Sequence, residues 1–154
     1  MTNQRMTANQ LVAYNLRRAR TLLGLTQEQA ARELEPYLGE RWSKRVFSAA
    51  ERSVTGERVR QFTADQLVAF AAAFDLPVSF FLEAPSPGMT VAALGAEEGV
   101  TGRQLTELAT GSEHHQARIE QAKQLRVVEH MRELAELGVE LPPIDLNKLG
   151  KEQQ

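Results

Sequence analysis

The 154-residue sequence predicts an all-α fold: a five-helix globule followed by a C-terminal helical region. Apolar residues recur at three- and four-residue spacing along several segments, which is the period of a helix rather than of a strand. Residues that favour helix starts precede these segments, and Gly or Pro follows several of them. The hydrophobic fraction of 42% suits a folded core, and no internal repeat is visible.

The first helix is expected over residues 10–23, after a flexible start at residues 1–8. Its apolar positions keep the helical spacing, and Gly24 is a natural residue to end it. Thr26 and Gln29 then form a capping box, in which each side chain bonds the other residue's backbone N–H. A second helix is therefore expected to begin at Thr26.

Pro36 and Gly39 interrupt the second helix, which is expected to end near Leu34 or Glu35. A linker of about seven residues then leads to the third helix, residues 43–52. These boundaries follow from the missing N–H of proline and from the preference of glycine for helix ends.

The third helix has two different faces on a wheel of about 100° per residue. Ser43 can cap it. The basic, small and polar side holds Lys44, Arg45, Ser48, Ala49 and Arg52, within about 140° of Lys44. The apolar side holds Val46, Phe47 and Ala50. Such a helix packs its back on a core and can present its front to a groove of DNA.

Residues 53–62 suit an exposed loop that carries Arg58 and Arg60. Thr63 or Asp65 can cap a fourth helix, whose apolar stripe ends before Pro77. A short fifth helix at residues 78–82 closes the globule, which is expected to occupy residues 9–84.

The rest of the chain is expected to hold a linker at 85–100, a helical region at 101–140 and a tail at 141–154. Thr101–Thr110 and Glu113–Leu137 are the two helical segments. In the second, an apolar stripe surrounds Met131 and is formed by Val127, Val128, Leu134 and Ala135. The stripe keeps no strict seven-residue repeat, so the sequence does not support a long parallel coiled coil.

Charge divides the chain into two halves. Residues 1–60 hold 11 Lys and Arg against 6 Asp and Glu, whereas residues 61–154 hold 7 against 14. A basic N-terminal half favours contact with a polyanion such as nucleic acid. The chain has no Cys and no apolar run of about 18 residues, so a cytoplasmic protein without membrane contact is expected.

The series LRRAR, GLTQEQAA and WSKRVFSAAER resembles the helix-turn-helix transcriptional regulators of the Cro/C1-repressor (XRE) family. The resemblance covers roughly residues 9–83. It implies a five-helix domain that presents its third helix to the major groove, usually from a two-fold dimer. The expected function is sequence-specific DNA binding, as a dimeric repressor.

The resemblance also implies roles for individual residues. Base contacts are expected from Lys44, Arg45, Ser48 and Ala49, with Arg45 the better candidate for bidentate reading of guanine. Gln27 matches a phosphate-binding position at the start of the second helix. The other expected backbone contacts are Arg17, Arg41, Ser43, Arg52, Arg58 and Arg60. Arg20 and Glu51 match a structural pair that joins the first helix to the end of the third.

Two loops depart from the family pattern. The connection between the second and third helices is about six residues longer than usual, and Ser53 stands where a glycine usually follows the third helix. Both changes affect the angle at which the third helix would dock. Trp42, at the start of that helix, is expected to anchor its loop on the core rather than to stack on a base.

Other functions are less well supported by the residues. His114 and His115 point about 100° apart on a helix, and no HExxH spacing occurs, so no metal or cofactor is expected. No catalytic constellation can be argued, so the chain is expected not to be an enzyme. The C-terminal helical region is expected to form a homodimer, with a protein partner or packing against residues 10–82 as the alternatives. An antitoxin-type autorepressor and a protein-interaction adaptor on the same fold remain alternative functions.

Overall fold

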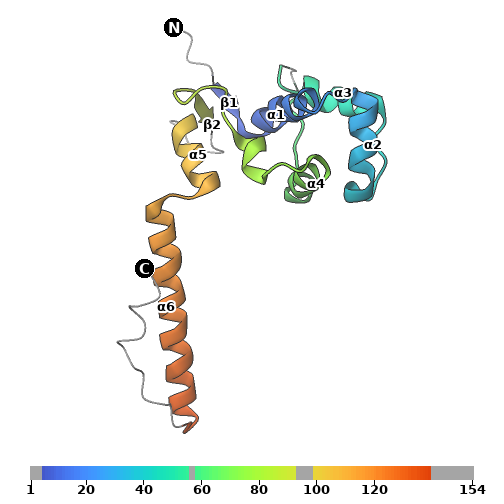
Figure 1. The fold of residues 1–154 in the computed structure, drawn as a ribbon. Helices are drawn as coiled ribbons and strands as arrows, with labels where there is room; N and C mark the ends of the chain where they lie inside the picture. The colour runs from blue at the N-terminus through green and yellow to red at the C-terminus, as the bar shows by residue number, and fades with distance from the viewer. Residues whose placement is uncertain (1–4, 56–57, 93–98, 140–154) are drawn as a thin grey trace. The chain divides into compact units, whose positions relative to one another are not determined.

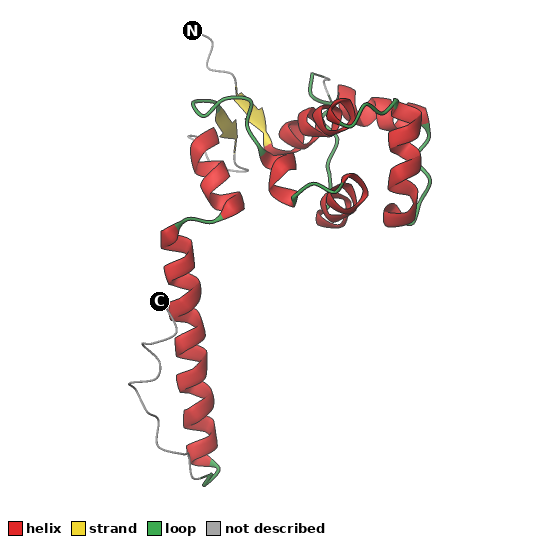
Figure 2. Ribbon diagram, viewed as in Figure 1, coloured by secondary structure: helices red, strands yellow, loops and turns green. Residues whose placement is uncertain are grey.

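The computed structural model describes residues 5–55, 58–92 and 99–139. The described chain is mostly helical and carries one small three-stranded sheet (Figure 1). It divides into two units, Met1–Gly111 and Ser112–Gln154. Figure 2 shows that the strands are few and short beside the helices. The expectation of a wholly helical fold is therefore wrong in part, because three short segments pair as strands.

Five helices form the globule expected from the sequence. They are α1 (Ala8–Leu22), α2 (Gln27–Leu38), α3 (Lys44–Arg52), α4 (Ala64–Phe74) and the 3₁₀ helix η1 (Val78–Leu82). Capping boxes begin α1, α2 and α4, with Thr7, Thr26 and Thr63 as their first residues. Local side-chain chemistry thus sets where these helices start.

α2 continues to Leu38, beyond the end expected near Leu34 or Glu35. Pro36 lies inside the last turn, where the loss of one backbone N–H removes only one helical hydrogen bond. Gly39, with φ of 68°, then ends the helix in the left-handed conformation that glycine adopts without strain. The connection to α3 is therefore shorter than the expected linker of about seven residues.

Aromatic side chains form the centre of the main core. Phe47, Phe70 and Phe81 are completely buried among leucine and alanine side chains of α1, α2 and α3. The Trp42 ring lies edge-on to Phe47 and Phe70, with centroids 6.4 and 5.8 Å apart, and is only 4% exposed. The expectation that Trp42 anchors its loop on the core is confirmed.

Asn15 is a polar residue within this core and is completely buried. Its Nδ2 donates to the backbone oxygens of Phe81 and Glu83, at 3.3 and 2.8 Å. Buried backbone carbonyls need such partners, because they have lost contact with water. Asn15 therefore fixes the end of η1 to the middle of α1.

The sheet joins the start of the chain to residues far along it. Strands β1 (Arg5–Thr7), β2 (Thr90–Ala92) and β3 (Val100–Thr101) lie in that order, with β1 parallel and β3 antiparallel to β2.

A second apolar cluster, formed by Leu11, Met89 and Val91, packs beside the sheet. The flexible start expected at 1–8 and the linker expected at 85–100 thus contain ordered strands at residues 5–7 and 90–92. Strands of two or three residues are too short to display an alternating pattern in sequence. Leu11 belongs to this second cluster and not to the main core, so β2 helps to cover it.

Two more helices follow, α5 (Gly102–Thr110) and α6 (Glu113–Glu136), close to the two segments expected. α5 belongs to the first unit and α6 to the second, so the expected single region at 101–140 is divided. The first unit also extends past the boundary expected at residue 84. The tail expected at 141–154 lies outside the described residues. No helix in the described ranges is long and apolar enough to cross a membrane.

Candidate nucleic-acid interface

α3 has one buried face and one exposed face, as its wheel indicates. Phe47 and Ala50 are completely buried in the core. Lys44, Arg45 and Ala49 are exposed on the other side, whereas Ser48 is half-buried. The four residues expected to read bases therefore lie along one side of a short helix whose back is fixed by packing.

Both ends of α3 are held by serine side chains. The Ser43 hydroxyl accepts a hydrogen bond from the Val46 N–H at 3.2 Å, which caps the helix as expected. Ser53 is buried, and its hydroxyl donates to the Ala50 carbonyl at 2.8 Å. Its φ of −66° is an ordinary helical value, so the chain leaves α3 without the left-handed glycine of the family pattern.

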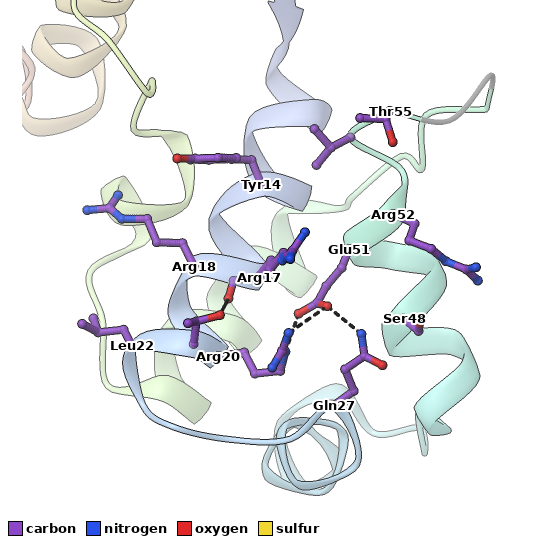
Figure 3. Close-up of a pocket in the computed structure, with 12 residues that line it drawn as sticks. Tyr14, Arg17, Arg18, Arg20, Leu22, Gln27, Ser48, Glu51, Arg52 and Thr55 are labelled. Carbon is purple, nitrogen blue, oxygen red and sulfur yellow. Dashed lines mark hydrogen bonds and ion pairs between the residues drawn. The ribbon is translucent and has the colours of Figure 1, made fainter.

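A network around Glu51 connects α1, α2 and α3 (Figure 3). Arg20 Nε donates to Glu51 Oε1 at 2.6 Å, and the Glu51 side chain is only 4% exposed. A second Arg20 nitrogen lies 3.3 Å from Glu51 Oε2, and a third donates to the Leu25 carbonyl at 2.9 Å. The structure thus brings together Arg20 and Glu51, the residues expected to pair, across the two helices.

Gln27 is part of the same network, which the sequence did not indicate. Its Nε2 donates to Glu51 Oε2 at 2.8 Å, so one amide hydrogen is used inside the protein. The amide has a second hydrogen, which can donate to a phosphate. Gln27 therefore links the start of α2 to α3 and keeps one amide hydrogen outside this bond.

An open groove of about 750 Å³ separates the exposed faces of α1 and α3, and Figure 3 shows its lining residues. Arg17 projects into the space between the two helices, whereas Arg52 projects outward from α3. Both side chains belong to exposed residues. The groove thus has cationic groups beside the helix that would read bases.

The remaining arginines expected to contact the DNA backbone differ in their surroundings. Arg41 and Arg58 are exposed, and Arg41 Nε lies 3.9 Å from a carboxylate oxygen of Glu35. The Arg60 guanidinium lies 4.5 Å above the Trp42 ring and 5.9 Å from Phe62, and its Nε is buried. Arg60 was expected to contact the DNA backbone from an exposed loop. Its guanidinium instead lies against the core, where a cation–π interaction with Trp42 holds it.

The loop after α3 is attached to the start of α1 by side chains that no sequence pattern singles out. Gln10 Nε2 donates to the Val54 carbonyl at 3.0 Å. Asn9 donates to the Gln61 side chain and accepts from the Phe62 N–H, both at 2.8 Å. No spacing in the sequence links Asn9 with residues more than 50 positions away. These bonds position the loop that carries Arg58.

Among the described residues, no group of three or more His, Cys, Asp or Glu could hold a metal ion. His115 instead caps the start of α6, with Nδ1 2.8 Å from the Ser112 hydroxyl. Comparisons with protein-family models, with curated proteins and with solved structures find no match to this chain. Its function must therefore be inferred from the geometry of its residues.

Proposed function

We propose that this chain is a sequence-specific DNA-binding transcriptional regulator of the Cro/C1-repressor (XRE) class, which inserts α3 into the major groove. The single observation that carries the proposal is the arrangement of α3. Its basic side chains are exposed, Phe47 on its other side is buried, and Glu51 is fixed to α1 and α2. A helix held in this way can present base-reading side chains without losing its orientation.

Arg45 and Lys44 are proposed to donate to base edges, while Ser48 and Ala49 contact bases from the next turn. A guanidinium can donate two hydrogen bonds to the O6 and N7 of guanine, and an alanine methyl can contact a thymine methyl. Gln27, Arg17, Arg41, Ser43, Arg52 and Arg58 are proposed to contact phosphates.

The regulator is proposed to bind a two-fold operator as a homodimer, with half-sites about one helical turn apart. α6 supports this because its apolar side chains Val127 and Val128 are more than half exposed. Occlusion of a promoter by the bound dimer is the simplest form of regulation, so a repressor is proposed.

The proposal is tested by selecting bound duplexes from a randomised pool with the full chain. A two-fold motif is expected, and Arg45→Ala should weaken binding to it by about 10-fold or more, because one bidentate contact contributes about 1–3 kcal/mol. Arg103→Ala removes the same charge from α5, which lies away from α3 in the first unit (Figure 1), and should leave the motif unchanged. Arg17→Ala should weaken binding to all duplexes and reduce the salt dependence.

A selection that enriches no motif would contradict the regulator and favour an adaptor on the same fold. Equal loss of affinity in the Arg45 and Arg103 variants would also count against it, because general charge alone would then explain binding.

A further inference from the structure

Trp42 fixes the direction in which the chain enters α3. It lies directly before Ser43, which caps the helix, and its ring is edge-on to Phe47, with centroids 6.4 Å apart. An apolar pair at these two positions, just before the cap and four residues after it, is a hydrophobic staple that sets the entry angle of a helix. Lys44 and Arg45 form the first turn of α3. The place of the Trp42 ring therefore helps to set where the side chains proposed to read bases lie.

Arg60 lies over this ring and comes from the loop that follows α3. Its guanidinium carbon is 4.5 Å from the centroid of the Trp42 ring and 5.9 Å from that of Phe62. The Arg60 Nε is buried and has no hydrogen-bond partner among the described residues. A buried N–H without an acceptor is costly, so the aromatic rings are the contacts that hold this guanidinium in place.

The segment that carries Arg60 is itself fixed to α1. Gln61 and Phe62, the next two residues, both bond to the Asn9 side chain at 2.8 Å. Arg60 thus connects a fixed point on α1 with the ring that precedes α3. The network around Glu51 holds the other end of the helix. Different contacts therefore hold the two ends of α3.

We propose that Arg60 is a positioning residue for sequence recognition. Through the Trp42 ring, it holds the first turn of α3 in the orientation that brings Lys44 and Arg45 to base edges. The inference rests on the proposed function of α3. A loosened first turn would occupy the reading orientation for only part of the time, and affinity for the specific site falls by that fraction. Most proposed phosphate contacts lie outside this turn, so affinity for a random duplex is kept.

Arg60→Lys tests the proposal in the full chain, because it keeps the positive charge and removes the planar group that stacks on the indole. Its affinity for the selected motif should fall by roughly 2- to 30-fold, the range that corresponds to cation–π contacts. Its affinity for a random duplex and the salt dependence of that binding should stay the same. Arg58→Ala, in the same loop, should instead weaken binding to both duplexes and lower the salt dependence. Circular dichroism checks that the helices are retained.

Hydrogen exchange of the chain without DNA measures the start of α3 directly. The Phe47 N–H donates to the Ser43 carbonyl at 3.0 Å, and the Ala30 N–H makes the matching bond to Thr26 at the start of α2, at 2.9 Å. Phe47 and Ala30 are both completely buried. Arg60→Lys should speed exchange at Phe47 by roughly the same 2- to 30-fold and leave Ala30 unchanged. A general loss of stability would speed both.

Three results would overturn the proposal. Unchanged affinity of Arg60→Lys for the motif would mean that charge alone is enough at this position. Equal losses for the motif and the random duplex would make Arg60 a phosphate contact. Equal acceleration of exchange at Phe47 and Ala30 would make its role one of general stability. A selection that enriches no motif would reject base reading, and with it the role in recognition, whereas faster exchange at Phe47 alone would still show that Arg60 holds the start of α3.

Discussion

Among single residues, Glu51 is the one whose carboxylate joins three helices at the candidate interface. Its carboxylate accepts hydrogen bonds from Arg20 of α1 and Gln27 of α2, although it belongs to α3. A carboxylate so deeply buried is stable only while these donors remain. The orientation of α3 therefore depends on a charged group rather than on apolar packing alone.

Glu51→Ala should lower the free energy of unfolding by about 3 kcal/mol, because the Arg20 guanidinium loses its partner in a site that is mostly closed to water. Urea denaturation measures this change. Glu28→Ala is the matched control. It breaks the Glu28–Arg32 pair, whose side chains are at least 60% exposed, and should change stability by less than about 0.5 kcal/mol. If the two substitutions lowered the free energy of unfolding equally, burial of the Arg20–Glu51 pair would not contribute to stability.

Among the elements, α5 is attached to the first unit by a close backbone approach. A Cβ atom at Gly102 would lie 2.5 Å from the Ser86 carbonyl oxygen and 2.7 Å from the Ala84 side chain. Gly102 is buried, and its N–H donates to the Met89 carbonyl at 2.8 Å. Glycine is required at residue 102 because there is no space for a Cβ atom. Its φ is outside the left-handed region, so the backbone conformation alone would allow another residue.

Gly102→Ala should therefore destabilise the first unit by about 1–3 kcal/mol, since the added methyl must displace backbone or α5 itself. Gly88→Ala is the control, because no atom lies within 4 Å of its added methyl and its φ suits alanine. It should be neutral or slightly stabilising. Thermal unfolding of both variants makes the comparison, and a stable Gly102→Ala variant would contradict the close packing.

Helices were predictable to the extent that their signals are local. Capping residues such as Thr26 and Thr63 and the apolar spacing gave the helix starts, and the wheel of α3 gave its buried face. The strands were not predictable, because β1 has no pattern of its own and depends on β2. The position of Arg60 on Trp42 was not predictable either, since only the fold brings these side chains together.

In the whole molecule, the first unit is larger than the five-helix globule. Leu11 is completely buried, and its partners Met89 and Val91 lie beyond the last helix of that globule. A fragment that ends after η1 therefore exposes an apolar side of α1.

A chain truncated after Pro87 should be less stable than one truncated after Gly111 by about 3 kcal/mol or more. Burial of each large apolar side chain contributes about 1.5–3 kcal/mol, and both Met89 and Val91 are lost. Both fragments lack α6, so the comparison concerns the first unit alone. Chemical denaturation gives the difference, and equal midpoints for the two fragments would place the sheet outside the stable unit.

The pairing of β1 with β2 also affects how the chain folds during its synthesis. Met6 pairs with Val91, about 85 positions later in the chain. At translation rates of about 5–20 residues per second, the first strand must wait roughly 4–17 seconds for its partner to be made. The helices from α1 to η1 are made earlier, because η1 ends at Leu82 and β2 begins at Thr90. β1 can therefore pair only after the helices from α1 to η1 have been made, although it precedes all of them in the chain.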